Sequence, residues 1–478
     1  MSSNRELGDP YELVVVGAGP AGLAAATAAA GLGINTVLLD EQSSLGGQIY
    51  RAIEETPLAD PAVLGKSYGR GRLLVRSFVA SGARHIPGAS VWHVAEGQGG
   101  CLTVGLSVGS AAHMIEARRV ILATGALERP FPIPGWTLPG VLAAGGAQTL
   151  LKSAAIVPAG YVVLAGTGPL LWLFAAQMLR AGGRITAFLD TASVENRRAA
   201  LAHLPGFLAS SYFREGLDLM RAVRRGAQVV RGVKALVAHG TERLSEVAFR
   251  RLGSTEERIP ADILLLHQGV VPDLNLAAAA GCKLTWDERQ LAFLPVTDRW
   301  GASSVEGIAI AGDGAGIMGS EAAAERGRLA ALDAACRLGR ITQSDRDRKA
   351  APVAKALARA TRGRAFLDAL FRPTRAFRVP EGETIVCRCE EVTARQVRES
   401  AAFGCPGPNQ LKAFLRAGMG PCQGRMCGLT VSALLAEARG VTMGEIGYFR
   451  LRPPVKPLTL SELAALPATP AAMEAVGR

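Results

Sequence analysis

The sequence predicts an α/β protein with two dinucleotide-binding units and a small, mostly helical C-terminal domain. Two strand–glycine turn–helix segments, at 12–40 and 161–190, predict the two units. Four paired cysteines near the C-terminus predict the third part. A length of 478 residues suits two or three domains. A composition of 49% hydrophobic and 20% charged residues indicates a globular chain with a large core.

The first glycine turn has the parts that a dinucleotide site needs. Apolar residues 13–16 predict a buried parallel strand, and Gly17, Gly19 and Gly22 follow it as G-x-G-x-x-G. The first glycine allows a tight turn, the second lets a pyrophosphate approach, and the third lets helix and strand pack closely. Pro20 and Ala21 begin an alanine-rich helix, whose N-terminus offers free N–H groups to phosphates.

The next strand ends on two acids. Asp40 lies 18 residues beyond Gly22, where a carboxylate can accept hydrogen bonds from ribose hydroxyls. Glu41 is the second candidate for the ribose. Its side chain should face away from the crevice if Asp40 points into it, because neighbouring side chains of a strand face opposite ways. The alternative for the whole segment is a glycine turn that serves packing only.

Three further segments resemble the glutathione-reductase class of two-dinucleotide flavoproteins. They are the strand and turn at 120–125, the strand at 307–313 with a helix from about 318 to 338, and the loop at 45–48. The resemblance covers roughly residues 11–340 and implies FAD, with Asp313 at the ribityl chain. Taken alone, Asp313 could equally be a helix N-cap. The residues expected near the flavin are Gly47, Gln48, Thr124, Gly125, Gly312 and Asp313.

The second glycine turn is incomplete. Gly166 and Gly168 are present, but Leu171 replaces the third glycine and would crowd the contact between helix and strand. Asp190 ends the next strand and could still meet a ribose. We expect a structural domain or a site for another adenine nucleotide, and NAD(P) or ATP binding stays open. The segment has no C-x-x-C redox pair.

The cysteine pairs predict a metal centre. Cys387 and Cys389 form a C-x-C pair, and Cys422 and Cys427 follow as C-x₄-C after 32 residues. Such thiolates can hold Zn²⁺ or a [2Fe–2S] cluster. We favour the cluster, because zinc knuckles prefer C-x₂₋₄-C pairs. Between the pairs, a capping box at 393–396 and a helix from Asn409, with Gly418 as its C-cap, are expected.

The segment around these cysteines resembles the [2Fe–2S] domain of bacterioferritin-associated ferredoxin, although that domain usually closes with C-x-x-C. With the phrase LKAFLRAGMGPCQGRMCG at 411–428, the whole chain resembles the alpha (A) subunits of bacterial opine oxidases of the octopine or nopaline type. The B subunits of hydrogen cyanide synthases and the alpha subunits of hydroxyproline and proline dehydrogenases are similar.

This resemblance implies an oxidoreductase acting on CH–NH donors, as the electron-transfer subunit of a heteromeric complex. An FAD-containing beta subunit of amino-acid-oxidase type would oxidise the opine. Electrons would pass through flavin and cluster to a quinone or another carrier, and an FMN at the partner interface is left open. The alternatives are the alpha subunit of a hydrogen cyanide synthase or hydroxyproline dehydrogenase, a stand-alone NAD(P)H-dependent reductase with a [2Fe–2S] relay, and a non-catalytic zinc-binding scaffold.

Charge and hydropathy indicate where in the cell the protein is expected. The net charge of +12 gathers in a basic stretch at 346–378, which we interpret as a solvated helix and linker rather than a nucleic-acid site. The first residues lack a signal-peptide pattern, and no uninterrupted apolar window of 18 residues predicts a membrane span. We expect a cytoplasmic protein with at most peripheral membrane contact.

The expected domains follow from these motifs. No Ser–His–Asp set, zincin motif or carboxylate dyad is present, so the sequence assigns no catalytic residue. The boundaries are an FAD-binding domain at 1–130 and 291–345, a second dinucleotide domain at 131–290, a basic helical linker at 346–380, a [2Fe–2S] domain at 381–440 and a tail at 441–478.

Overall fold

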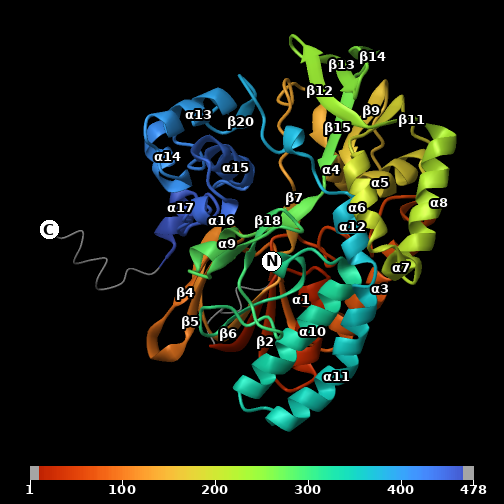
Figure 1. Ribbon diagram of the computed structural model, residues 1–478. Helices are drawn as coiled ribbons and strands as arrows, with labels where there is room; N and C mark the ends of the chain where they lie inside the picture. Colours follow the sequence, from red (N-terminus) through yellow and green to blue (C-terminus); the bar gives the residue numbers. More distant parts are fainter. Residues whose placement is uncertain (1–9, 467–478) are drawn as a thin grey trace.

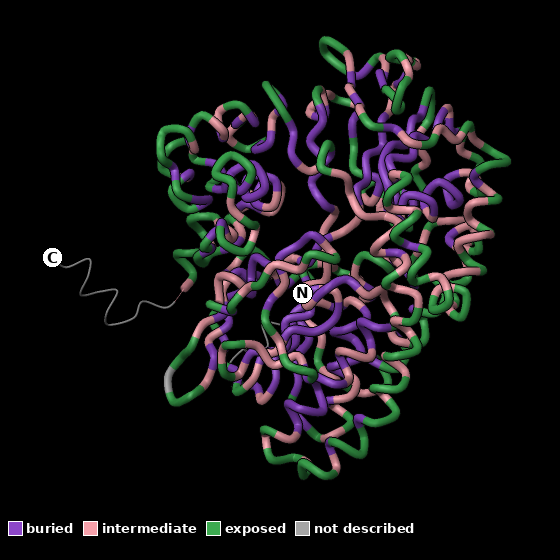
Figure 2. The backbone as a smooth tube through the Cα atoms, viewed as in Figure 1, coloured by how far each residue is buried: buried purple, intermediate pink, exposed green. Residues whose placement is uncertain are grey.

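A computed structural model describes residues 10–466 and contains three packed units (Figure 1). The predicted domain ends at 1–9 and 467–478, including the start considered for a signal peptide, lie outside the described residues. The first unit occupies the lower part of Figure 1, the second the upper right and the C-terminal unit, in blue, the upper left. Figure 2 shows that buried backbone runs through the sheets of the first two units.

The first unit is built on a seven-stranded sheet of order β3-β2-β1-β6-β5-β4, with β19 paired to β6. Strand β1 runs parallel to both β2 and β6, and β4, β5 and β6 pair antiparallel. The strands are β1 (Tyr11–Val16), β2 (Thr36–Asp40), β3 (Arg84–Pro87), β4 (Ser90–Glu96), β5 (Leu102–Val108), β6 (Ala111–Leu122) and β19 (Ile308–Ile310).

Helices α1 (Pro20–Ala30) and α10 (Ser320–Arg337) cross in close contact beside this sheet. The crossing is tight because Gly327 has no side chain: a Cβ there would lie 2.1 Å from the carbonyl oxygen of Ala21. Helix α10 agrees with the helix expected from about 318 to 338. Smaller elements complete the unit: η1 (Pro61–Leu64), α2 (Lys66–Gly69), α3 (Gly71–Ala80), η2 (Gln98–Gly100), α9 (Asn275–Ala279), β17 (Leu284–Asp287), β18 (Ala292–Pro295) and η3 (Gly312–Ala315).

A two-stranded ribbon, β7 (Ala126–Glu128) with β16 (Val270–Pro272), joins the first unit to the second. The second unit has a parallel sheet of order β11-β10-β9-β15-β8 and an antiparallel sheet of order β12-β13-β14. Its elements are β8 (Val141–Ala143), α4 (Ala144–Ala154), β9 (Val162–Thr167), α5 (Pro169–Arg180), β10 (Ala187–Asp190), α6 (Val194–Leu201), α7 (Leu204–Leu208), α8 (Ser211–Gly226), β11 (Gln228–Arg231), β12 (Val233–Gly240), β13 (Leu244–Arg251), β14 (Glu257–Pro260) and β15 (Ile263–Gln268).

The basic stretch is helical. Helix α11 (Gln343–Ala360) begins before the expected position because Thr342 caps it, accepting from the backbone N–H of Asp345 at 3.1 Å. It packs along α10, where Arg346 lies over the ring of Trp300 and pairs with Asp333 at 2.9 Å. Helix α12 (Arg364–Leu370) and η4 (Arg375–Phe377) lead to the C-terminal unit.

The C-terminal unit has its own hydrophobic core. The predicted capping box is present, since Thr393 and Gln396 exchange hydrogen bonds at the start of α13. The predicted end of the next helix was wrong: α14 starts at Pro408, and Arg416, not Gly418, is its left-handed C-cap. Its elements are β20 (Ile385–Cys387), β21 (Val392–Thr393), α13 (Ala394–Ala402), α14 (Pro408–Leu415), α15 (Gly428–Arg439), α16 (Met443–Ile446) and α17 (Leu460–Ala464).

Residues on both sides fix the C-terminal unit to the rest of the chain. Trp136 Nε1 donates to the carbonyl oxygen of Ile385 at 2.7 Å, and Val455 N donates to the carbonyl oxygen of Trp92 at 3.1 Å. The Val455 side chain is buried in a core of the first unit. Among the helices placed in the structure, none is both long enough and apolar enough to cross a bilayer.

Candidate functional site

The first glycine turn lies at the carboxyl ends of β1, β2 and β6, the edge where ligands bind in open α/β sheets. Gly17 has φ +106°, and its N–H donates to the carbonyl oxygen of Leu39 at 2.7 Å. A Cβ on Gly22 would lie 1.7 Å from the carbonyl oxygen of Gly17, so only glycine lets α1 start this close. A Cβ on Gly19 would meet no atom nearer than 4.0 Å. The turn is therefore closely packed at Gly22 and less so at Gly19.

The two acids after β2 behave differently. Asp40 is buried, and its carboxylate accepts from the backbone N–H groups of Ala18 and of Gln42, the latter at 2.7 Å. Burial raises the pKa of Asp40, and these two N–H groups oppose the rise. Glu41 is exposed and forms an ion pair with Lys456 of the C-terminal segment. Asp40 thus fixes the glycine turn to the end of β2.

The loop predicted to pass near a flavin lies against the glycine turn. Gly46 N donates to the carbonyl oxygen of Ala18 at 2.9 Å, and a Cβ on Gly47 would lie 2.7 Å from the Cα of Gly19. Gln48 is exposed, and its carbonyl oxygen accepts from Lys152 Nζ at 3.2 Å. The loop is therefore held between the glycine turn and the second unit.

The other predicted flavin residues are neighbours of the same turn. A Cβ on Gly312 would lie 2.7 Å from the Cβ of Ala21, and one on Gly314 would lie 3.4 Å from Thr124 Oγ1. Asp313 Oδ1 accepts from the backbone N–H groups before α10, those of Met318 at 2.8 Å and Gly319 at 3.1 Å. The N-cap alternative considered for Asp313 is wrong, because Gly319 is the N-cap of α10 and Asp313 bonds the two residues just before that helix.

Sequence reasoning missed the residues that connect this turn to the C-terminal unit. Asp273 N donates to the carbonyl oxygen of Gly125 at 3.0 Å, and Thr124 Oγ1 donates to the carbonyl oxygen of Asp273 at 3.2 Å. Asn275 Nδ2 then donates to the carbonyl oxygen of Gln423 at 3.1 Å, inside the loop that carries two of the four cysteines. No local pattern predicts these contacts, which join residues about 150 positions apart.

The four cysteines come together in the C-terminal unit. Cys387 ends β20, and Cys427 is the N-cap of α15, so the N-terminus of that helix faces the thiols. A hydrogen bond with the Cys427 thiol, together with backbone N–H groups, lowers the pKa of Cys387 to about 6. Cys389 is exposed and neighbours Cys422. A Cβ on Gly420 would lie 2.2 Å from the Cβ of Cys389, so this glycine lets the two loops meet.

The thiols nevertheless form two pairs rather than one closed shell. Within residues 10–466, no group of three or more His, Cys, Asp or Glu side chains surrounds a common metal position. Cys405 is buried, and its Sγ donates to the carbonyl oxygen of Gly407 at 3.4 Å, which agrees with an inert thiol. As a donor set, four thiolates near the N-terminus of a helix suit iron–sulfur or zinc chemistry.

Side chains pack closely against the second glycine turn. Leu171 is fully buried, and a Cβ on Gly166 would lie 1.7 Å from the carbonyl oxygen of His267. A Cβ on Gly168 would lie 2.9 Å from the His267 ring, whose Nδ1 is 2.5 Å from Glu128 Oε1 on β7. Asp190 is buried and accepts from Ala192 N at 2.9 Å.

Comparisons with known proteins agree with this architecture. The family "pyridine nucleotide-disulphide oxidoreductase" matches residues 11–335, and the "sarcosine oxidase A3 domain" matches 381–467. The chain is 47% identical to the A subunit of opine oxidase from Rhizobium meliloti, over 100% of this chain and 91% of that protein. It is 48% identical to the A subunit of opine oxidase from Agrobacterium tumefaciens, over 100% of this chain and 96% of that protein. The HcnB subunit of hydrogen cyanide synthase from Pseudomonas aeruginosa is 34% identical, over 94% of this chain and 97% of that protein.

Two solved structures share the fold. L-proline dehydrogenase from P. horikoshii has a TM-score of 0.69 at 19% identity, over 95% of this chain and 79% of that one. Thioredoxin reductase of T. acidophilum has a TM-score of 0.52 at 20% identity, over 69% of this chain and 99% of that one. The thioredoxin reductase matches only part of this chain. That match confirms the predicted two-dinucleotide fold for the flavoprotein portion. The chain belongs to the pyridine nucleotide-disulphide oxidoreductase family and, within it, to the family of opine oxidase A subunits.

Proposed function

We propose that this chain is the electron-transfer subunit of a heteromeric flavoprotein dehydrogenase that oxidises the C–N bond of an opine. A partner subunit with its own FAD would hold the substrate. FAD at the first glycine turn would supply two-electron chemistry, and a [2Fe–2S] cluster at the four cysteines one-electron chemistry. The single observation that carries the proposal is the hydrogen bond from Asn275 to Gln423 in the thiol-bearing loop, two residues from Asp273, which bonds the Thr124–Gly125 turn.

The residues at the first turn suit FAD. A Cβ on Gly19 would clash with nothing, α1 begins at this turn, and the backbone N–H groups that bond Asp313 reach only one of its oxygens. Asp313 would meet the ribityl chain, and the loop at Gly47 and Gln48 the ring. Whether Asp40 or Glu41 would meet the ribose depends on Asp40 giving up its contact with Ala18.

The residues at the thiol site suit a [2Fe–2S] cluster. The four thiols form two neighbouring pairs, and backbone N–H groups of Gly418 and Glu390 donate to Cys387. Such N–H donors stabilise the negative charge of cluster sulfur. The names of the relatives, which are subunits of an oxidase or a synthase, support a heteromeric enzyme.

A cofactor inventory of the co-purified complex tests the proposal. We expect FAD, iron and acid-labile sulfide, and opine-dependent dye reduction only when the partner subunit is present. Cys422→Ser should remove iron and sulfide while flavin is retained, and Cys101→Ser, in a thiol remote from the group, should change neither. Zinc in place of iron, or full opine oxidation by this chain alone, would contradict the proposal.

A further inference from the structure

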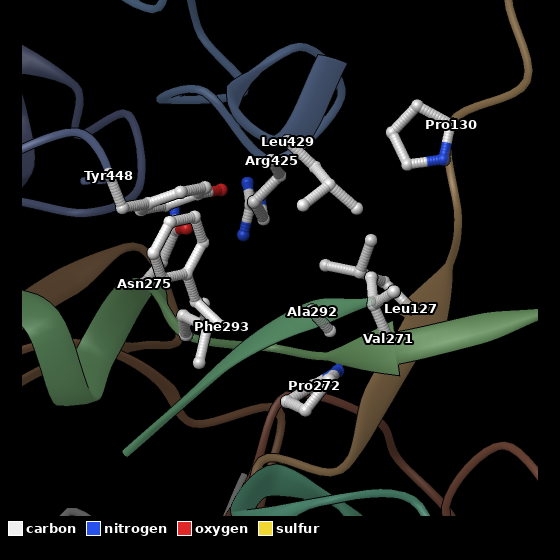
Figure 3. Close-up of a pocket in the computed structure, with 11 residues that line it drawn as sticks. Leu127, Pro130, Val271, Pro272, Asn275, Ala292, Phe293, Arg425, Leu429 and Tyr448 are labelled. Atoms are coloured by element: carbon white, nitrogen blue, oxygen red, sulfur yellow. The ribbon is translucent and has the colours of Figure 1, made fainter. Parts of the chain in front are cut away.

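The contact between the first and second units contains buried polar side chains. Figure 3 shows mostly apolar side chains where the C-terminal unit meets the first unit. Where the second unit meets the first, by contrast, Gln148 and Lys152 of α4 and Gln177 of α5 are only 6%, 3% and 1% exposed. Burying a polar group is unfavourable unless it finds a hydrogen-bond partner. The partners of these three side chains therefore show what they hold in place.

The three side chains form one chain of hydrogen bonds across the contact. Lys152 Nζ donates to Gln148 Oε1 at 3.1 Å, and Gln148 Nε2 donates to Gln177 Oε1 at 2.8 Å. Gln177 Nε2 then donates to the carbonyl oxygen of Leu64 in η1, also at 2.8 Å. Helices α4 and α5 of the second unit are thus joined to the backbone of the first unit.

The other two donors of Lys152 reach a second segment of the first unit. Nζ donates to the carbonyl oxygens of Gln48 at 3.2 Å and Ile49 at 3.0 Å. An ammonium group has three N–H donors, so all of them are used, and all three acceptors are neutral amide oxygens. A buried charge without a carboxylate partner is unfavourable, and a methionine would fill the same space without one. Packing alone therefore does not explain a lysine at this position.

The segment that Lys152 holds packs against the first glycine turn on its other side. Gly46 N donates to the carbonyl oxygen of Ala18 at 2.9 Å, and a Cβ on Gly47 would lie 2.7 Å from the Cα of Gly19. The loop at 46–49 therefore lies between the turn and the ammonium group. A shift of the two carbonyl groups would move the backbone that packs on Gly19, where the proposed function places FAD.

We propose that Lys152 is a positioning residue for the cofactor of the first unit, because its ammonium group fixes the loop at 46–49 against the first glycine turn. The role rests on the proposed function, since the site that it serves is the proposed FAD site. It also gives the second unit a task. Although the glycine turn of that unit packs against the ring of His267, its helix α4 completes the site of the first unit.

The proton on Lys152 makes this role measurable. Burial lowers the pKa of Lys152 to about 7, so the group loses its charge and one N–H donor between about pH 6 and 9. Arg51, whose charge also lowers this pKa, and Tyr68, whose ring centroid lies 5.9 Å from Nζ, face the ammonium group. Neither changes its charge in this range, because arginine stays protonated and burial raises the pKa of Tyr68 to about 12.

Fluorescence of the FAD released when the full chain is diluted measures its dissociation constant. At pH 6 we expect Lys152→Met to raise this constant by at least about tenfold, the value of a hydrogen bond to a charged group. From pH 6 to 9 the wild-type constant should rise by about tenfold, whereas that of Lys152→Met should stay the same. Lys234→Met, the same change at an exposed position of β12, is the matched control and should behave as the wild type.

Lys152→Arg keeps a charge that does not titrate in this range, so its affinity for FAD should not depend on pH. This variant decides the question if Lys152→Met fails to fold. Hydrogen exchange of the Gly46 and Tyr50 amides follows the loop directly and should be faster in Lys152→Met than in the wild type at the same pH.

A wild-type dissociation constant together with wild-type exchange in Lys152→Met would overturn the positioning role. So would a wild-type pH dependence of FAD release in Lys152→Arg. Absence of FAD from the wild-type chain would instead refute the proposed function, and the exchange rates would still decide whether Lys152 holds the loop.

Discussion

Gly22→Ala would place a methyl group inside the first glycine turn. The added Cβ would lie 1.7 Å from the carbonyl oxygen of Gly17 and 2.9 Å from its carbonyl carbon. Both atoms are backbone and cannot rotate away as a flexible side chain would. An ordinary contact needs about 3.5 Å, so α1 would have to retreat by roughly 1.8 Å.

That movement of α1 would also disturb two other close contacts of the helix. Gly312 and Gly327 both pack against Ala21, the residue before Gly22, with no room for a methyl group. Overpacking of a core costs about 1–3 kcal/mol. A loss of about 3 kcal/mol lowers the melting temperature of a domain of 150–250 residues by roughly 6–12 °C. Because the helix N-terminus moves away from the phosphate position, flavin should also be lost.

Differential scanning calorimetry and the flavin content of the purified protein measure the two effects. Gly31→Ala is the control at the other end of α1: its φ is −63°, and an added Cβ would meet nothing nearer than 3.4 Å. We expect this control to keep its flavin and to melt within about 2 °C of the wild type. Equal melting temperatures and equal flavin content in the two variants would refute the account of the first turn.

Two further predictions concern the contacts between units. Burial lowers the pKa of Lys152 to about 7, whereas an unfolded lysine keeps a pKa near 10.4. Between these values the unfolded chain binds more protons, so the free energy of unfolding should rise from pH 7 to 9.5 by more in the wild type than in Lys152→Met. Urea unfolding of both chains at each pH measures this, and parallel pH dependences would contradict it. Val455→Asp would bury a carboxylate in the first unit, beside the Trp92 carbonyl oxygen that accepts from its N–H. Trypsin should then cleave the segment at 450–456 at least about tenfold faster, since local opening scales with the lost stability. An unchanged cleavage rate would show that Val455 does not hold the segment in place.

The features that sequence predicted well are local ones. The first turn depends on residues within one strand–helix segment, where the glycine spacing alone specifies the backbone path. The capping box at Thr393 and Gln396 is equally local, and the structure contains it. The end of α14 was misplaced because a glycine is the usual left-handed residue, whereas Arg416 adopts φ +57° there.

The features that sequence could not predict join distant parts of the chain. The ion pair between Glu41 and Lys456 spans 415 positions, and nothing in either neighbourhood indicates it. The hydrogen bond from Asn275 to Gln423 spans 148 positions. The contact of the Asp40 carboxylate with the Ala18 N–H was also not predicted, and the ribose role of Asp40 stays a prediction. Each depends on how complete units pack, which periodicity and spacing do not encode.

The two glycine turns differ in how their surroundings pack. In the first unit the tight contact is at Gly22, whereas a Cβ on Gly19 would clash with nothing. In the second unit a buried leucine occupies the third glycine position, and the ring of His267 packs against Gly168. Glu128, on the strand that enters the second unit, holds that ring at 2.5 Å and also accepts from the N-terminus of α4. Side chains that join the two units thus pack against the second turn, and both its structural role and the placing of flavin at the first turn stay predictions.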